Sequence, residues 1–152
     1  MLAYIAGFLD GDGSLMLQIK KRSDSKRAIR FMSTICFYQD TRHEKDLYWI
    51  KEVLGIGYVS RRKDGMTELR INGFRQVYSI LKDLLPYIRF KRFQAAALLR
   101  ACALLSSIKF KALTKEHLCE LCDLIWVVQT ENYTTKHKKS RSELYTILGL
   151  TP

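Results

Sequence analysis

The chain begins with apolar residues at the spacing of a helix, namely Leu2, Ile5, Phe8 and Leu9. This apolar run stops at Asp10, far short of the roughly 20 residues that a membrane-spanning helix requires. Glycines follow at positions 11 and 13. We expect them to end the helix and to free the backbone, so that Asp12 between them can approach a ligand closely.

Small residues form a second line along the same predicted helix. Ala3, Gly7 and Gly11 recur every four residues and would share one face. A face without large side chains lets two helices approach backbone to backbone, as small residues do between membrane helices. The pattern therefore predicts a homodimer in which two Asp12 carboxylates lie side by side. Adjacent carboxylates repel unless a proton or a cation lies between them, and their hard oxygen atoms favour Mg²⁺ or Ca²⁺.

Alternating apolar and polar residues predict four strands, at 14–20, 29–39, 57–62 and 66–72. Because the strands divide into two hairpins, we expect one antiparallel sheet whose apolar face is covered by helices. The opposite face would carry mostly long polar side chains. These are Gln18, Lys20, Arg22, Arg30, Thr34, Tyr38, Ser60, Arg62, Glu68 and Arg70.

Capping residues and apolar stripes predict the remaining helices. Thr41 and Glu44 have the spacing of a capping box, which would open a helix that Gly55 ends. Further helices are expected at 74–84, 89–106, 114–132 and 140–149. The resulting order is α-β-β-α-β-β-α with additional C-terminal helices. We therefore predict an α+β fold in which residues 1–152 form a single domain.

The charge of the chain indicates the kind of partner. Lysine and arginine number 26 against 15 aspartates and glutamates, a formal net charge of +11. This excess favours nucleic acid; an anionic membrane surface is the weaker alternative, because no long basic amphipathic helix stands out. Polar strand faces are usually no more than solvated. Here the charge favours a face whose long donors and acceptors read bases in a DNA groove.

The length of the predicted strands sets the size of the DNA site. A strand of about ten residues spans roughly 33 Å, which matches roughly ten base pairs of a duplex. Two subunits would then read roughly twenty base pairs, and the twofold axis predicts a pseudo-palindromic site.

The four cysteines, at positions 36, 102, 119 and 122, do not indicate a disulfide framework. Cys119 and Cys122 fall in a helical apolar pattern and are interpreted as small core residues. Cys119 and Cys122 have C-x₂-C spacing with His117 nearby. No further ligands follow at close spacing, so zinc binding is a minor alternative.

Residues Ile5–Gly13 resemble the nine-residue signature of the LAGLIDADG homing endonucleases. The residues identical to the signature are Ala6, Gly7, Asp10, Asp12 and Gly13. Taken alone, the Asp-Gly-Asp-Gly stretch would more simply be a turn, but the predicted element order also looks like the core of this family. One copy of the signature is present, which is similar to the homodimeric, intron-encoded type. Residues 55–59 and 89–95 resemble that type as well.

The resemblance implies roles for individual residues. Asp12 would be the metal ligand, and Gly11 would offer a backbone carbonyl. Gln39 would organise water around the scissile phosphate, and Lys91 would balance charge in the transition state. Gln39 is otherwise a strand end at the surface, and Lys91 is otherwise one more phosphate contact. The fourth residue of the pocket stays open between the two neighbours Arg42 and His43.

The resemblance also implies an activity. It predicts a Mg²⁺-dependent double-strand break with 3′ overhangs in double-stranded DNA, with Mn²⁺ substituting and Ca²⁺ binding without cleavage. The alternatives are an RNA maturase that binds its host intron and a regulator that binds without cutting. No membrane partner is expected. The predicted location is intracellular, in a chloroplast, a mitochondrion or the cytoplasm of a prokaryote.

Overall fold

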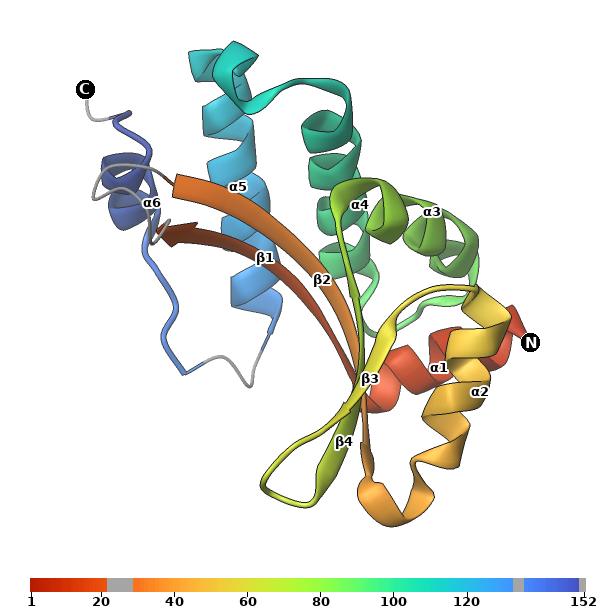
Figure 1. Cartoon of the computed structure of the whole chain (residues 1–152). Coiled ribbons are helices and arrows are strands. Elements are labelled where there is room, and N and C mark those ends of the chain that lie inside the picture. Colours follow the sequence, from red (N-terminus) through yellow and green to blue (C-terminus); the bar gives the residue numbers. More distant parts are fainter. Residues whose placement is uncertain (22–28, 133–135, 151–152) are drawn as a thin grey trace.

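The computed structural model describes residues 1–21, 29–132 and 136–150 (Figure 1). Its helices and strands confirm the predicted α-β-β-α-β-β-α order and the C-terminal helices. The elements are α1 (Leu2–Asp12), β1 (Gly13–Lys21), β2 (Ile29–Asp40), η1 (Thr41–His43), α2 (Lys45–Leu54), β3 (Tyr58–Arg61), β4 (Met66–Asn72), α3 (Phe74–Leu84), η2 (Leu85–Tyr87), α4 (Arg92–Ser107), η3 (Phe110–Ala112), α5 (Lys115–Glu131) and α6 (Arg141–Ile147). None of the described helices is long and apolar enough to cross a membrane.

The four strands form one antiparallel sheet in the order β1-β2-β4-β3. Strand β2 is the longest and pairs with β1 over its first part and with β4 over its last part. Both predicted hairpins are present. The second hairpin joins the first through β4 rather than β3, because the chain crosses over through α2 before it returns.

Helices α3, α4 and α5 lie along one side of the curved sheet (Figure 1). The strand residues that face them are buried and apolar, including Leu15, Leu17, Ile35, Phe37, Leu69 and Ile71. Cys122 belongs to the same core and Cys119 packs against it, as their helical spacing predicted, and Cys102 of α4 is part of this core as well. Burial of this apolar surface holds the helices on one face and leaves the polar face uncovered.

The end of α1 differs from the prediction. The helix continues through Gly11 to Asp12, so Gly11 does not end it. Gly13 ends the helix with a φ of −108°, an extended conformation that any residue adopts. Glycine is required there for space: a Cβ would lie 2.5 Å from Leu9 Cδ1 and 2.8 Å from the Leu9 carbonyl oxygen.

The capping box predicted at residues 41–44 is wrong. Asp40 caps the short turn η1, since its carboxylate accepts a hydrogen bond from the Arg42 backbone N–H. The Glu44 carboxylate instead accepts hydrogen bonds from Arg61 Nε at 3.0 Å and from Thr67 Oγ1 at 2.8 Å. Glu44 therefore fastens the start of α2 to the β3–β4 hairpin. The last two helices begin where their predicted ranges do, and Thr114 and Ser140 at those positions cap them with capping boxes.

Replacing Glu44 with glutamine should lower the free energy of unfolding at pH 7. Hydrogen bonds from Arg61 and Thr67 hold the pKa of Glu44 below its ordinary value. Because the folded-state pKa is the lower one, this stabilisation is present above the unfolded pKa and is lost as the pH falls through the folded value. Urea unfolding should show a lower free energy of unfolding for Glu44→Gln at pH 7, and this difference should shrink as the pH falls below about 4.

Glu52→Gln is the matched control, because Glu52 is exposed on the same helix and its side chain makes no ion pair among the described residues. It should leave stability unchanged at both pH values. If Glu44→Gln lowers the free energy of unfolding by the same amount in acid, the stabilising role given to the ionised Glu44 carboxylate is wrong.

Candidate active site

A hollow of about 470 Å³ lies where α1 ends, β2 ends and α4 begins. It brings together four residues that the sequence analysis selected from distant parts of the chain: Gly11, Asp12, Gln39 and Lys91. The rest of the lining is Gly13, Ser14, Met16, Tyr38, Met66 and Asn132.

Lys91 reaches the hollow because Asp10 anchors the segment before α4. The buried Asp10 carboxylate accepts backbone N–H bonds from Arg89 at 2.6 Å, Phe90 at 3.3 Å and Lys91 at 3.0 Å. The Lys91 ammonium in turn donates to the Asp10 carbonyl oxygen. The two acidic residues of the signature thus differ in role: Asp10 is buried and anchors a loop, whereas Asp12 is exposed at the hollow.

The environment of Lys91 changes its protonation equilibrium. Only 6% of its surface is exposed. Burial lowers the pKa of Lys91 from its ordinary value of 10.5, while the nearby Asp10 and Asp12 carboxylates act in the opposite direction. A cation that is held near carboxylates and little solvated is suited to balance negative charge on a bound group.

Gln39 lies at the end of β2, with its side chain partly fixed by its own backbone neighbour. Its Oε1 accepts a hydrogen bond from the Asp40 N–H at 2.9 Å. The NH₂ group is therefore the polar group that Gln39 offers to a molecule in the hollow.

Asn132, just beyond α5, lines the hollow and was not predicted. Its Nδ2 donates to the Leu15 carbonyl oxygen at 2.9 Å, and its Oδ1 accepts from Gln94 Nε2 at 3.3 Å. These bonds tie the ends of α5, α4 and β1 together. The only signal in the sequence is indirect, since Gln94 lies in the segment 89–95 that resembles the family.

Neither candidate for the fourth residue of the pocket lines the hollow. Arg42 turns to Asp40, with Nε 3.0 Å from Oδ1 and Nη2 2.9 Å from Oδ2. This pair lowers the pKa of Asp40 to about 2. His43 is exposed on η1 and is not part of the lining.

The polar face of the sheet carries most of the predicted DNA-reading residues at its surface. Gln18, Lys20, Arg30 and Arg62 are exposed, and Tyr38, Ser60 and Arg70 are partly exposed. Two residues of the predicted set are buried instead: Thr34 donates to Asn72 Oδ1 at 2.7 Å, and Glu68 is surrounded by basic and hydroxyl groups. Arg22 lies outside the described residues.

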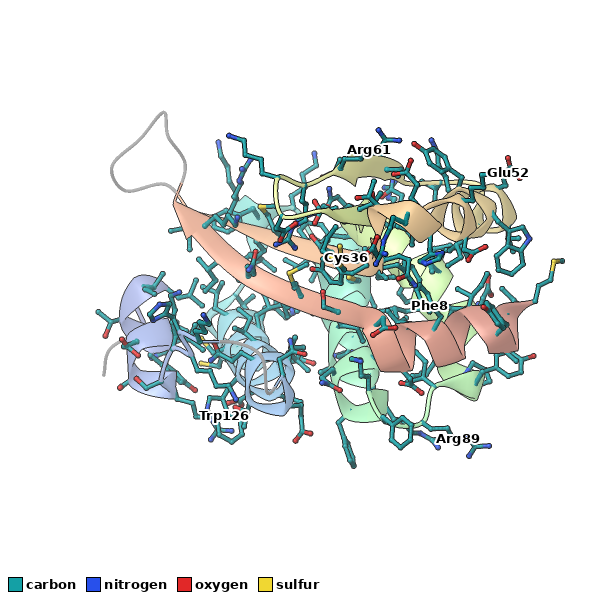
Figure 2. All side chains as sticks on the ribbon, turned by 90° about the horizontal axis from the view of Figure 1, so that it is seen from below. Phe8, Cys36, Glu52, Arg61, Arg89 and Trp126 are labelled. Carbon is teal, nitrogen blue, oxygen red and sulfur yellow. The ribbon has the colours of Figure 1, made fainter. Side chains whose placement is uncertain are left out.

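The predicted small-residue face of α1 is open. Ala3, Gly7 and Gly11 are exposed, and a Cβ on either glycine would meet no atom within 4 Å. The opposite face of α1 is buried through Ile5, Ala6 and Leu9. Phe8, labelled in Figure 2, stacks against Phe37 of β2 with ring centroids 6.1 Å apart. The helix is thus fixed on the sheet while its small residues face outward.

Comparison with known proteins gives the same family as the sequence motif. The family model of the LAGLIDADG endonucleases matches residues 5–96, more than half of the chain. The chain is 35% identical to the DNA endonuclease I-CvuI of Chlorella vulgaris over 107 residues, which cover 70% of this chain and 66% of that protein. It is 29% identical to the DNA endonuclease I-CreI of Chlamydomonas reinhardtii over 143 residues, covering 93% and 84% of the two chains.

Solved structures agree in fold. Two crystal structures of I-CvuI bound to DNA match 97% of this chain and 92% of theirs at 29% identity, with TM-scores of 0.84 and 0.85. One contains the I-CreI target in the presence of Mg, with the DNA not cleaved, and the other contains the target of I-CvuI in the presence of Ca. The signature, the fold and these likenesses agree, and the chain belongs to the LAGLIDADG endonuclease family.

Proposed function

We propose that the chain is a site-specific homing endonuclease that acts as a homodimer. It makes a metal-dependent double-strand break with 3′ overhangs in a long pseudo-palindromic DNA site. The observation that carries this proposal is the meeting of Asp12, Gln39 and Lys91 around one hollow. A carboxylate that can hold a cation, an amide donor and a buried ammonium are groups suited to the hydrolysis of a phosphodiester.

The uncovered sheet face supports double-stranded DNA as the partner. It presents exposed cationic and amide side chains on a surface that β1 and β2 form in register, where Lys20 pairs with Arg30 and Gln18 with Met32. The relatives named above are DNA endonucleases, and I-CvuI has been crystallised on DNA. We propose that this face lies in the major groove and that each hollow lies over one strand.

The donors at the end of α1 fit a hard divalent cation. Asp12 contributes an exposed carboxylate, and Gly11 lies in the last turn, where helix carbonyl oxygens lack partners within the helix. The described residues contain no group of three acidic, histidine or cysteine side chains that could hold a metal alone. We therefore propose that DNA phosphates and the second subunit complete the site, with Mg²⁺ as the natural cation, Mn²⁺ as a substitute, and Ca²⁺ binding without cleavage.

The roles of the chain's own groups follow from their positions. The Asp12 carboxylate holds the cation, which supplies Lewis-acid polarisation of the phosphodiester. The NH₂ group of Gln39 orients water toward the phosphorus atom. Lys91 stays beside the phosphate, and its ammonium stabilises the charge that develops on the oxygens. Asp10 fixes this ammonium in place, so Asp10 is a positioning residue.

The open face of α1 supports the homodimer. Two copies of α1 that pack through Ala3, Gly7 and Gly11 bring both Asp12 residues to the centre of the complex, one for each DNA strand. We also propose that residues 1–152 act as one domain. An organellar intron is the proposed origin, supported by the organisms of the relatives, Chlorella vulgaris and Chlamydomonas reinhardtii.

Replacing Asp12 with asparagine should abolish cleavage and preserve binding. The change removes the charged metal ligand and almost no volume, so we expect a rate loss of about 100-fold or more. The test digests a large randomised DNA library with Mg²⁺ and sequences the new ends, with binding measured in Ca²⁺. Asp83→Asn, an exposed change on α3, is the control and should cut normally.

Full cleavage by Asp12→Asn would refute the role of Asp12 as the metal ligand. Salt-sensitive binding without cleavage by the unmodified chain would favour the maturase or the regulator.

Replacing Gly7 with leucine should disrupt the dimer. A Cβ at Gly7 meets nothing within 4 Å in the chain itself and the residue is exposed, so we expect the larger side chain to clash with a second copy. Sedimentation at micromolar concentration should show a dimer for the unmodified chain and a monomer for Gly7→Leu. Ser79→Leu places the same side chain at an exposed position of α3 and should stay dimeric. If the unmodified chain sediments as a monomer, the dimer proposal is wrong.

Replacing Lys91 with methionine should lower cleavage by about 100-fold while DNA binding in Ca²⁺ is kept. Methionine fills similar space, so the loss reports the missing charge rather than a collapsed pocket. Thermal unfolding checks that the variant folds, and Lys82→Met on the exposed side of α3 is the control. Undiminished cleavage would show that Lys91 only supports the loop at residues 89–91.

A further inference from the structure

Glu68 is a buried carboxylate on a face that otherwise carries cations. It lies in β4, paired in register with Tyr38 of β2 on one side and Ser60 of β3 on the other. Only 8% of its surface is exposed. A side chain with so little exposure is a poor direct contact for DNA, and a buried charge requires donors around it.

Those donors come from four residues. Arg70 donates through Nε to Oε1 at 2.7 Å and through Nη2 to Oε2 at 3.3 Å. The Ser60 hydroxyl donates to Oε1 at 3.4 Å, and Arg62 Nη1 lies 4.0 Å from Oε2. The Cys36 thiol approaches Oε2 from the neighbouring strand at 4.0 Å, and Figure 2 shows Cys36 near the middle of the sheet. Glu68 is therefore the anchor, and Arg70 is its nearest cation.

The way Arg70 is held decides which of its donors stay free. The pair with Glu68 uses the edge formed by Nε and Nη2, so the edge formed by Nη1 and the second hydrogen of Nη2 is left. Glu68 is buried, whereas the Arg70 side chain is 34% exposed. The free edge therefore faces the solvent side of the sheet, where two parallel N–H donors match O6 and N7 of a guanine.

Arg62 is held differently. Its Nη2 pairs with Asp64 at 2.7 Å, and its guanidinium lies over the Tyr38 ring at 5.9 Å from the centroid. It is thus bound to the turn at the tip of the hairpin. On the uncovered face of this hairpin, Arg70 is the arginine that pairs with a buried carboxylate and still keeps two parallel N–H donors free.

We propose that Arg70 reads a guanine in the major groove of each half-site, and that Glu68 is the positioning residue that orients Arg70 for this contact. The inference rests on the proposed function, because it requires that this sheet face binds DNA. Glu68 makes no contact with DNA in this arrangement. Its effect is to reduce the freedom that Arg70 loses on binding and to disfavour rotamers that would suit other bases.

The experiment selects bound sites from a randomised DNA library in Ca²⁺ and sequences them for the unmodified chain, Glu68→Gln, Arg70→Lys and Glu52→Gln. The unmodified chain should show a strong guanine preference at one position of each half-site. Arg70→Lys, which keeps the charge and loses the fork, should reduce that preference roughly tenfold. Glu68→Gln should do the same at that position alone, with the other positions unchanged.

Glu52→Gln is the control for the change in charge. Glu52 is exposed on α2, and Figure 2 shows it well apart from Cys36 and the middle of the sheet. It should raise affinity for non-specific DNA about as much as Glu68→Gln does and leave every base preference intact. Thermal unfolding identifies a variant that fails to fold; Arg70→Lys, at a partly exposed position, tests the guanine contact even if Glu68→Gln does not fold.

Two outcomes overturn the inference separately from the proposed function. If the unmodified chain selects a site and both variants keep the same guanine preference, Arg70 contacts only phosphate and the inference is wrong while the endonuclease proposal stands. If Glu68→Gln weakens all positions equally, Glu68 supports the sheet rather than Arg70. If the unmodified chain selects no site, the proposed function fails and the inference fails with it.

Discussion

The Asp10 carboxylate connects the two halves of the candidate site. Three successive backbone N–H groups of residues 89–91 point to it, and the chain separation from Asp10 to Lys91 is 81 residues. A buried donor left without a partner costs about 1–3 kcal/mol. Loss of the Asp10 carboxylate would leave three N–H donors of the loop without this acceptor, so it would destabilise the loop conformation. The loop conformation in turn sets where α4 begins and where the Lys91 ammonium enters the hollow. The position of the Lys91 ammonium, the group proposed to act on the phosphate, thus depends on a carboxylate that is almost fully buried.

Helix α1, which carries Asp10, has two further roles. One face buries Ile5, Ala6 and Leu9 in the core, and the other face exposes Gly7 and Gly11. The last residue of the same helix, Asp12, lines the hollow. Because the core fixes the rotation of the helix about its axis, it also fixes where the glycines face and where Asp12 lies. The core, the proposed subunit contact and the proposed metal ligand therefore cannot shift independently.

Local patterns predicted the parts of the fold that local contacts determine. Strand β4 and helix α3 have the predicted bounds, since the turn at residues 62–65 precedes β4 and Gly73 separates the two elements. The error at Glu44 comes from partners distant in sequence. Glu44 has the spacing of a cap, but Arg61 and Thr67 of the hairpin take its carboxylate.

In the candidate site, too, contacts between residues distant in sequence were not predictable from local patterns. Family resemblance selected Gln39 and Lys91, which no periodicity marks, and the structure places them together. Asn132 was not predicted because its role depends on Leu15 and Gln94, two residues in other elements.

The arginines of the β3–β4 hairpin have acidic partners: Glu44 for Arg61, Asp64 for Arg62 and Glu68 for Arg70. The Arg62–Asp64 pair is exposed on both sides and adds little stability, so its main effect is on the orientation of the guanidinium. A held guanidinium loses less freedom on binding than a free one, but its partner reduces the attraction to phosphate. In the proposed complex, these pairs reduce the general attraction of the hairpin to DNA and define the geometry of its donors, while the net charge of +11 over the whole chain supplies attraction to phosphate.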